Sequence, residues 1–466
     1  MSYELPGKAS TALMQQGMSY LRDGLSYQSA SEKSKAKGFS APAQMIVGRA
    51  EGDYVWDVDD NRYIDFQNGW ATNPLGNCHP EIIEAVHQAH LKYGFQWEHP
   101  LRIPLAEKLA EIMPGSSLPR FSFEVSGTEA AESAIHMALC HKQRRYIISF
   151  TSCFHGEGLG TKMVGGYSSE KNMYMEGWSG GVLKAPYPYS ENIPAGMSQE
   201  QYVEYCLWYL RTHITEYIVP AENIAAIIIE PGLAEGGNWI PSVDFVRGVR
   251  DICDEFDWLM IADEVLTGLG RTGKMWSVEH YDVVPDILVA GKNLSGGIEP
   301  CAGVAARDEI LGDNPRASGG STFAGTPAGC AAALKTLEIY ERDNIVDNAA
   351  SLATVAEKRM QDWAQKYEIV GQVRSLGLLM GVSFRSAVEG MEHYYVGRSV
   401  RDEMLRRGVW AICDHEPTIR MYPALNMDEA VLLEGLDLVE ESIAEVERNG
   451  VTVGDYPPMP SGNVGF

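Results

Sequence analysis

The sequence predicts an α/β protein in which parallel βαβ units form a large domain and a smaller α+β domain follows. Three observations predict this class. Short β-branched runs alternate with helical periodicity through the middle of the chain, and polar residues stand directly after these runs. Long helical stretches surround short strands after about residue 335. With 466 residues, the chain is long enough for two hydrophobic cores.

The domain order follows from where these patterns change. Residues 1–60 are expected to form an N-terminal arm and part of the small domain, with two short runs around an Asp-Asp-Asn turn near its end. Residues 61–335 are expected to form the large domain. Residues 336–466 are expected to form the C-terminal small α+β domain, because residues 352–367 and 427–449 have helical periodicity.

Apolar runs in the middle of the chain predict the strands of the large sheet. They are RYIISFT (145–151), IAAIIIE (224–230), WLMIADE (258–264) and DILVAG (286–291). Between the second and third runs, apolar residues recur at helical spacing in residues 242–257, as expected of a crossover helix.

Composition excludes several kinds of partner. The 38 basic and 63 acidic residues give a net charge of −25, which opposes binding to nucleic acid and to anionic membranes. Eight cysteines are scattered without a CxxC pair or a cluster with histidine. The sequence therefore predicts reduced thiols and no metal site. Because the N-terminus lacks a signal-peptide pattern and no run reaches membrane-span length, the sequence predicts a cytoplasmic protein.

Polar residues at the strand ends indicate where chemistry takes place. In open α/β sheets, ligands bind beyond the carboxyl ends of the strands. In chain order, these positions hold Phe154 and His155, Glu230, Asp263 and Glu264, and Lys292. The sequence therefore predicts carboxylates and a lysine along one edge of the sheet.

An anion site is expected upstream of these strands. Ser126, Gly127 and Thr128 precede a helix whose apolar face repeats through residues 131–139. Free backbone N–H groups at such a helix start favour an anion. Serine and threonine also cap ordinary helices, and both interpretations stand for this motif taken alone.

Together, these residue types suggest pyridoxal phosphate as the cofactor. Its aldehyde requires a lysine amine, which Lys292 can supply, and its ring nitrogen requires a carboxylate, which Asp263 can supply. Phe154 would stack on one face of the ring and Val265 would press on the other. Each residue alone also has a purely structural explanation, but their occurrence in this order favours a cofactor site.

Nine segments of the chain together form a recognisable pattern: YVWDVDDNRYIDF, GNCHPEI, VSGTEAAESA, FHGEG, IIIEPGLAEGG, IADEVLTGLGRTGK, LVAGKNLSGG, GGSTFAGTPAG and IRMYPAL. These segments resemble the class III (ω-type) pyridoxal-phosphate-dependent aminotransferases, a family of fold type I, and the resemblance covers roughly residues 45–445. The resemblance implies a large domain with a mainly parallel seven-stranded sheet flanked by helices, plus the smaller α+β domain.

The resemblance also implies roles for the cofactor residues. Lys292 would be the Schiff-base lysine and proton shuttle, and Asp263 would pair with the pyridinium nitrogen. The cofactor-binding set would be Ser126, Gly127, Thr128, Phe154, His155, Glu230, Asp263, Val265, Lys292 and Thr322. Thr322 would reach the phosphate from the partner subunit, so the site would be assembled in a homodimer. The sequence leaves open whether two dimers form a tetramer.

Four residues are expected to contact substrate. Arg420 matches the arginine that grips an α-carboxylate, and Glu235 matches the glutamate that pairs with it when that carboxylate is absent. Trp70 stands where relatives place an aromatic residue of the substrate pocket. Glu299 occupies a position that is often apolar or aromatic, and we expect it to meet the distal amine of a diamine or ω-amino acid.

Three departures from the family pattern stand out. Leu266 stands where glutamate-using relatives have glutamine, and an apolar residue at this position resembles the pattern of pyruvate-dependent ω-aminotransferases. Pyruvate and 2-oxoglutarate therefore both remain candidate acceptors. Asn77 stands in GNCHP where GHCHP is usual, and PAL replaces a double proline near the C-terminus. Neither of the last two touches a residue of the expected chemistry.

The expected activity is that of an omega-transaminase. An amino group would pass from an amine or ω-amino acid to pyruvate or 2-oxoglutarate by a ping-pong mechanism. The alternatives within this fold are an amino-acid racemase or epimerase and a dialkylglycine-type decarboxylase. A binding protein without turnover is disfavoured because both Lys292 and Asp263 are present.

Overall fold

The chain divides into two compact units. The computed structural model describes residues 2–17, 19–20, 43–166, 180–312, 320–386, 393–413 and 417–451. One unit is Pro80–Ala350, and the other combines Met1–His79 with Ser351–Phe466. The boundaries after residues 60 and 335 stay predictions of where the domains divide.

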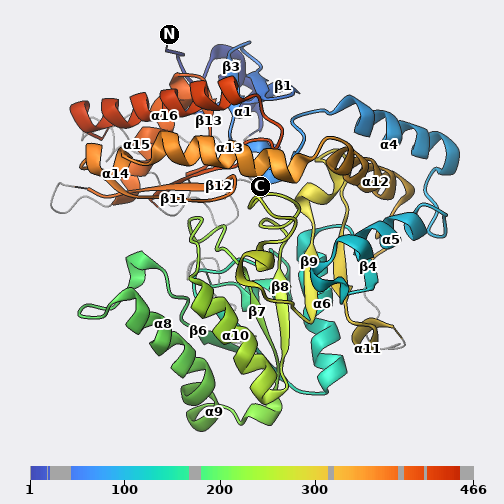
Figure 1. Ribbon diagram of the computed structural model, residues 1–466. Coiled ribbons are helices and arrows are strands. Elements are labelled where there is room, and N and C mark those ends of the chain that lie inside the picture. Colours follow the sequence, from blue (N-terminus) through green and yellow to red (C-terminus); the bar gives the residue numbers. More distant parts are fainter. Residues whose placement is uncertain are drawn as a thin grey trace. The chain divides into compact units, whose positions relative to one another are not determined.

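The larger unit is built on a seven-stranded sheet in the order β4-β10-β9-β8-β7-β5-β6 (Figure 1). Its strands are β4 (Arg120–Glu124), β5 (Tyr146–Phe150), β6 (Val182–Ala185), β7 (Ile224–Ile229), β8 (Leu259–Asp263), β9 (Ile287–Ala290) and β10 (Ala302–Ala306). Strand β10 is antiparallel to both neighbours, and the other pairs are parallel. The predicted mainly parallel sheet of seven strands is confirmed.

Helices surround this sheet. The longer ones are α4 (Pro80–Tyr93), α5 (Arg102–Ile112), α6 (Gly127–Lys142), α8 (Gln199–Trp208), α10 (Val243–Phe256) and α12 (Pro327–Arg342), and α13 (Ile345–Met360) crosses the unit boundary. The shorter ones are η2 (Pro114–Ser116), α7 (Leu159–Val164), η4 (Ser190–Asn192), the π-helical η5 (Tyr209–His213), α9 (Ile214–Tyr217), η6 (Ala221–Asn223), η7 (Ser277–Tyr281), η8 (Lys292–Ser295) and α11 (Asp308–Leu311).

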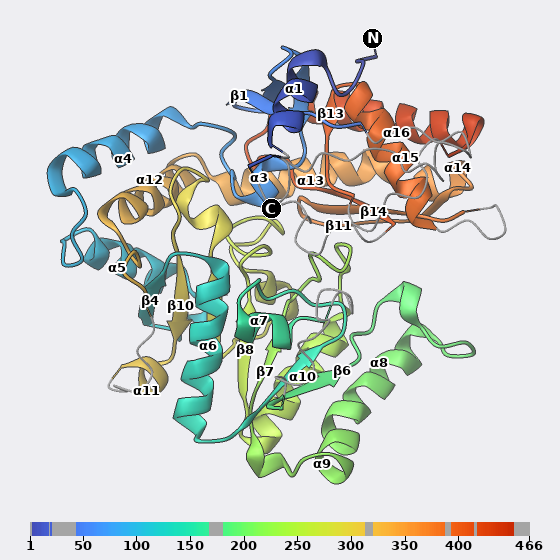
Figure 2. The same cartoon turned by 180° about the vertical axis from the view of Figure 1, so that it is seen from behind.

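Both faces of the sheet are buried, which explains why its strands are continuously apolar in sequence. Successive residues of β7 enter different cores: Ile227 lies in one hydrophobic cluster with Val249 of α10, and Ile228 lies in another with Ala134 of α6. Figure 1 shows α10 in front of the sheet, and Figure 2 shows α6 on the opposite face. The four predicted strands and the predicted crossover helix are confirmed as β5, β7, β8, β9 and α10.

The described residues of the smaller unit form two sheets. One has the order β1-β2-β3-β13 and comprises β1 (Val47–Glu51), β2 (Tyr54–Asp57), β3 (Arg62–Asp65) and β13 (Val409–Trp410). The other has the order β11-β12-β14 and comprises β11 (Val370–Leu376), β12 (Leu379–Phe384) and β14 (Thr418–Met421). Its helices are α1 (Lys8–Gly17), the short α3 (Asn68–Ala71), α14 (Trp363–Lys366), α15 (His393–Arg406) and α16 (Glu429–Asn449).

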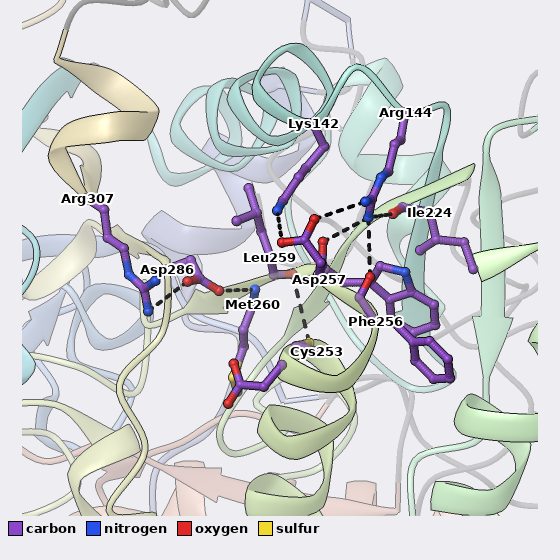
Figure 3. Close-up of polar contacts among 12 residues, drawn as sticks. Lys142, Arg144, Ile224, Cys253, Phe256, Asp257, Leu259, Met260, Asp286 and Arg307 are labelled. Atoms are coloured by element: carbon purple, nitrogen blue, oxygen red, sulfur yellow. Dashed lines mark hydrogen bonds and ion pairs between the residues drawn. The ribbon is translucent and has the colours of Figure 1, made fainter. Parts of the chain in front are cut away.

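Ion pairs close the edge of the large sheet where its parallel strands begin (Figure 3). The Asp286 carboxylate lies 2.8 Å from both Arg250 and Arg307 and accepts a 2.7 Å hydrogen bond from the Met260 backbone N–H. Nearby, Asp257 pairs with Lys142 at 2.6 Å and with a neighbouring arginine. These contacts join the helices to the amino ends of the strands.

Candidate active site

The residues predicted at the strand ends lie along the carboxyl edge of the large sheet. Because β10 is antiparallel to both β4 and β9, strands β4, β9, β8, β7 and β5 all end at this edge. The residues at or just beyond these five ends are Ser126, Lys292, Asp263, Glu230, and Phe154 with His155. The prediction that these residues follow strands ending at one edge of the sheet is confirmed, whereas their roles stay predictions.

The start of α6 approaches the end of β8 closely. A Cβ atom added at Gly127 would lie 2.7 Å from Cγ1 of Val265, and one added at Gly291 would lie 3.4 Å from the same atom. A side chain at position 127 would therefore displace Val265. The glycine brings the first amides of α6, the end of β8 and the segment before Lys292 into one small space.

Ser126 caps α6, and the first amides of the helix remain available for an anion. The Ser126 hydroxyl accepts a 3.2 Å hydrogen bond from the Glu129 N–H, and its carbonyl accepts one from Ala130. The N–H groups of Gly127 and Thr128 precede the first intrahelical hydrogen bonds, as at every helix start. Capping by Ser126 and anion binding by the two following amides are thus compatible.

The loop after β5 is fastened to the same helix. The Thr128 hydroxyl accepts a 3.2 Å hydrogen bond from the Glu157 N–H, and Gly156 has a φ of 127°, which brings its backbone against Thr128. The Glu132 carboxylate accepts a 3.0 Å hydrogen bond from Gly160. The role of Glu132 was not predicted from the sequence, because its partner Gly160 lies 28 residues further along the chain and comes close only in the folded protein.

His155 and Asp263 form a buried ion pair. Nδ1 of His155 donates to Oδ2 of Asp263 at 2.8 Å, and the His155 side chain is fully buried. Burial disfavours the imidazolium, but the neighbouring Cys153 and Asp263 outweigh it and raise the pKa of His155 to about 10. The other Asp263 oxygen accepts a 3.1 Å hydrogen bond from the Val265 N–H. Within the described residues, Nε2 of His155 has no hydrogen-bond partner.

Glu230 holds the backbone beside this pair. One carboxylate oxygen accepts a 2.7 Å hydrogen bond from the Phe154 N–H, and the other accepts a 3.0 Å hydrogen bond from the Ala234 N–H. Burial raises the pKa of Glu230 to about 7, with His155 opposing the rise. Glu230 therefore fixes the loop that carries Phe154.

The carboxylate next to Asp263 turns the other way. Glu264 is buried, and its oxygens accept hydrogen bonds from the Thr267 hydroxyl at 2.5 Å and the Val278 N–H at 2.8 Å. Burial raises the pKa of Glu264 to about 7. Of the two carboxylates that end β8, only Asp263 contacts His155, so Glu264 serves the fold.

Lys292 occupies an unusual backbone conformation. It follows β9 in η8, is half-buried, and has a φ of 42°, a region that residues other than glycine rarely adopt. Gly296 and Gly297 also have positive φ values, of 63° and 73°. The chain therefore turns sharply at the lysine, and such strain is typical of functional positions.

Three other predicted residues lie in the larger unit outside this cluster. Thr322 is exposed beside Phe323, whose side chain is 61% exposed. Glu299 lies 3.7 Å from Nε2 of His90. Glu235 is half-buried in the loop after β7.

Two predicted substrate residues belong to the smaller unit. Arg420 is buried in β14 and lies opposite Gly381 of β12. Trp70 is half-buried in α3, where its φ of 60° is left-handed. The pairing of Arg420 with Glu235 stays a prediction.

The residues at the carboxyl edge fit pyridoxal phosphate. Lysine, aspartate, helix-start amides and an aromatic residue follow strands that end at the same edge of one sheet, and the close approach at Gly127 leaves room only for backbone there. The buried Nε2 of His155 adds a polar atom beside Asp263 that the described part of the chain leaves unpaired. Among the described residues, no group of three or more metal-ligating side chains occurs, and no helix is long and apolar enough to cross a membrane.

Comparisons with known proteins agree with this chemistry. A family model described as aminotransferase class-III matches residues 37–443. The chain is 36% identical over 354 residues to a probable 4-aminobutyrate aminotransferase of Bacillus subtilis, covering 74% of this chain and 80% of that protein. It is 31% identical over 417 residues to the leucine/methionine racemase of Thermococcus litoralis, covering 88% and 93%. A solved amine transaminase from an uncultivated Pseudomonas species, with PLP bound, has a TM-score of 0.80 and 26% identity, covering 86% of this chain and 95% of that one.

Proposed function

The chain belongs to the class-III aminotransferase family and uses pyridoxal phosphate, and from this premise we propose that its amino donor is an amine or an ω-amino acid. The acceptor is an oxo acid, pyruvate or 2-oxoglutarate, and the cycle is ping-pong. The observation that carries this proposal is the meeting of Lys292, the Asp263–His155 pair and the start of α6 at one sheet edge.

When bound, pyridoxal phosphate supplies an aldehyde that can hold the amino group and a ring that draws electrons from the substrate carbon. Asp263 would hold the ring nitrogen, and His155 supports that carboxylate through its 2.8 Å hydrogen bond. The amides of Gly127 and Thr128 would bind the phosphate. Lys292 would anchor the cofactor and carry the proton between carbon atoms.

Loop anchoring explains how Phe154 would meet the ring. Its backbone is fixed by Glu230, and its loop is fixed to α6 through Thr128. An aromatic side chain held in this way can stack without losing conformational freedom on binding. We propose that Glu230 acts as a positioning residue for Phe154 rather than as a proton donor.

A panel of donors and acceptors tests the proposed activity. Purified enzyme is mixed with one amine or ω-amino acid at a time, and the cofactor absorbance is followed without any oxo acid. We expect one turnover per site with an accepted donor, and recovery of the starting spectrum after adding pyruvate or 2-oxoglutarate. Spectra that stay unchanged with every donor would contradict the proposal.

Arg420 and Glu235 are proposed to switch between substrates with and without an α-carboxylate. Removing a charge-assisted hydrogen-bond donor should weaken binding of the oxo acid roughly 10- to 100-fold. Arg420→Ala should therefore raise the KM for the acceptor but not for amines that lack a carboxylate. Arg374→Ala, in the same three-stranded sheet, is the matched control and should leave both constants unchanged.

Glu299 is proposed to contact the distal amine of a dicationic donor. It lies 3.7 Å from His90 and is partly exposed, so its carboxylate is reachable from solvent. Glu299→Gln should raise the KM for diamines selectively, whereas the surface variant Glu338→Gln should not. An equal rise for neutral amines would reject this role.

The active form is proposed to be a homodimer. Phe95, Trp97 and Phe323 are 46%, 54% and 61% exposed, and the rings of Phe95 and Phe323 lie 5.1 Å apart beside the exposed Thr322. Apolar surface of this kind favours an interface. If Thr322 serves the partner's phosphate site, co-expressed Lys292→Ala and Thr322→Glu chains should form dimers with one intact site. Activity no greater than that of the separate variants would contradict this arrangement.

Racemisation is the second candidate activity, because a racemase shares 31% identity over 88% of the chain. Incubation with one enantiomer of an amino acid and no oxo acid separates the two activities. A transaminase stops after one turnover per site, whereas a racemase continues.

The cytoplasmic location remains a prediction from the scattered cysteines.

A further inference from the structure

The segment that carries Trp70 is a left-handed turn. Asn68, Gly69, Trp70 and Ala71 have φ values of 54°, 60°, 60° and 60°. Three of these four are not glycine, and L-residues in this region crowd Cβ against the backbone. Such a turn persists only where surrounding contacts determine it.

Asp65 supplies the first of these contacts. Its Oδ1 accepts hydrogen bonds from the backbone N–H groups of Gln67 at 3.0 Å and Asn68 at 2.7 Å. The Gln67 side chain then accepts from the Trp70 N–H at 3.2 Å. Burial raises the pKa of Asp65, while the donors around it oppose the rise.

Asn77 holds the other oxygen of this carboxylate. Its Nδ2 donates to Oδ2 of Asp65 at 2.9 Å and to the Gly52 carbonyl at 3.2 Å, and its Oδ1 accepts from Nδ2 of Asn73 at 2.8 Å. Asp65 and Asn77 are both buried. The turn is thus bounded on both sides by one network centred on the Asp65 carboxylate.

We propose that Asn77 is a positioning residue: by fixing Asp65 it holds the left-handed turn and thereby the orientation of Trp70. The effect on substrate rests on the proposed function together with the expectation from the sequence that Trp70 lines the substrate pocket. Asn77 replaces the histidine of the usual GHCHP pattern. An amide does not titrate near neutral pH, so the Asn77 donor itself does not change with pH, unlike that of a histidine.

The chain offers a matched control for this hydrogen bond. In the β2–β3 hairpin, Nδ2 of Asn61 donates to Oδ2 of the buried Asp57 at 2.9 Å, the same length as the Asn77–Asp65 bond. Asn61→Ala therefore removes an equivalent interaction in the same unit. An effect on Trp70 that occurs in Asn77→Ala but not in Asn61→Ala is therefore not caused by a general loss of stability.

Fluorine NMR tests the positioning directly, without turnover. The holoenzyme is labelled with 5-fluorotryptophan, and Trp70→Phe identifies the Trp70 signal among those of 10 tryptophans. We expect Asn77→Ala to move or broaden that signal and Asn61→Ala to leave it in place. Asn77→His retains an N–H donor and should return the signal most of the way. A Trp70 signal that stays in place in Asn77→Ala, or moves as far in Asn77→His, would overturn the proposal.

Kinetics then separate this inference from the proposed function. Asn77→Ala should raise the KM for bulky amines about tenfold while changing kcat little, and the rise should disappear in the Trp70→Phe background. Asn61→Ala should change neither constant. If the Trp70 signal moves but every KM is unchanged, the positioning role of Asn77 stands and the substrate role of Trp70 is wrong.

Discussion

The two edges of the large sheet use charge for different purposes. At the amino edge, Asp286 is paired with Arg250 and Arg307 and accepts from a backbone N–H. Figure 3 shows the Arg307–Asp286 pair and the pairs of Asp257 with Lys142 and Arg144. At the carboxyl edge, Asp263 meets a single imidazole, and the far nitrogen of that imidazole has no hydrogen-bond partner within the described residues.

This difference shows that parallel strands allow stability and chemistry to be separated. All five strand ends that carry predicted cofactor residues lie on one edge, so charges on the opposite edge can be neutralised without affecting the site. Strain follows the same division, because Lys292 at the carboxyl edge has a φ of 42°. Substitutions at the amino edge should therefore change stability without changing turnover, whereas substitutions at the carboxyl edge should lower turnover.

The largest contrast is expected between two lysines. Lys292→Ala should lower turnover by about 10⁴-fold or more, because both cofactor attachment and proton transfer are lost. Lys142→Ala, at the amino edge, should leave kcat unchanged. Steady-state rates with saturating donor and acceptor measure both. Comparable turnover in the two variants would remove the distinction between the edges.

Paired aspartates sharpen the comparison. Asp286→Asn should reduce the free energy of unfolding by about 3 kcal/mol, because the half-buried arginines lose their buried counter-charge. The rate per folded molecule should remain unchanged. Asp263→Asn should instead lower the rate per folded molecule, and it should also reduce stability because the buried His155 loses its counter-charge. Urea unfolding with parallel assays checks both, and an unchanged rate per folded molecule in Asp263→Asn would contradict the assignment.

The buried carboxyl group of Glu264 should make the stability of the protein depend on pH. Its pKa is raised to about 7 by burial, so between pH 5 and 7 the folded state binds more protons than the unfolded state. Stability should therefore fall as pH rises through this range, by up to about 3 kcal/mol. Glu264→Gln should lose the part of this slope that Glu264 contributes and keep the part that comes from Glu230, whose pKa is also raised to about 7, while the surface variant Glu338→Gln keeps the whole slope. Parallel stability curves for wild type and Glu264→Gln from pH 5 to 8 would contradict the buried proton.

The smallest effect is expected at Asp257. Its side chain is 73% exposed, so its pairs with Lys142 and Arg144 are screened by solvent. Asp257→Asn should change the unfolding free energy by no more than about 1 kcal/mol and should not change turnover. Thermal unfolding at low and high salt measures this change in stability. A loss comparable to that of Asp286→Asn would show that burial does not determine how much each ion pair at the amino edge contributes to stability.

Sequence patterns predicted strands β5, β7, β8 and β9 and the polar residues at their ends, for a physical reason. A strand buried on both faces must be continuously apolar, so a polar residue at its end stands out, as Asp263 and Lys292 do. The contacts between loops were not predictable in this way. The Glu132 bonds to the loop after β5 and the Phe154–Glu230 bond depend on loop conformations that no short-range pattern encodes.

The smaller unit shows the same limit. Its hairpin of β2 and β3 follows from the Asp-Asp-Asn turn. The left-handed turn at residues 68–71 does not, because it depends on Asp65 and Asn77, which are brought together only by folding. The departure at Asn77 was visible in the sequence, but its partner was not.

The central claim is that Lys292 holds the cofactor at the carboxyl edge. Borohydride reduction of the holoenzyme, followed by proteolysis and mass spectrometry, tests it most directly, because reduction fixes pyridoxal phosphate to its lysine. We predict the added mass on the peptide that contains Lys292 and its loss in Lys292→Ala. The same mass on a different lysine of the wild-type enzyme would contradict the claim.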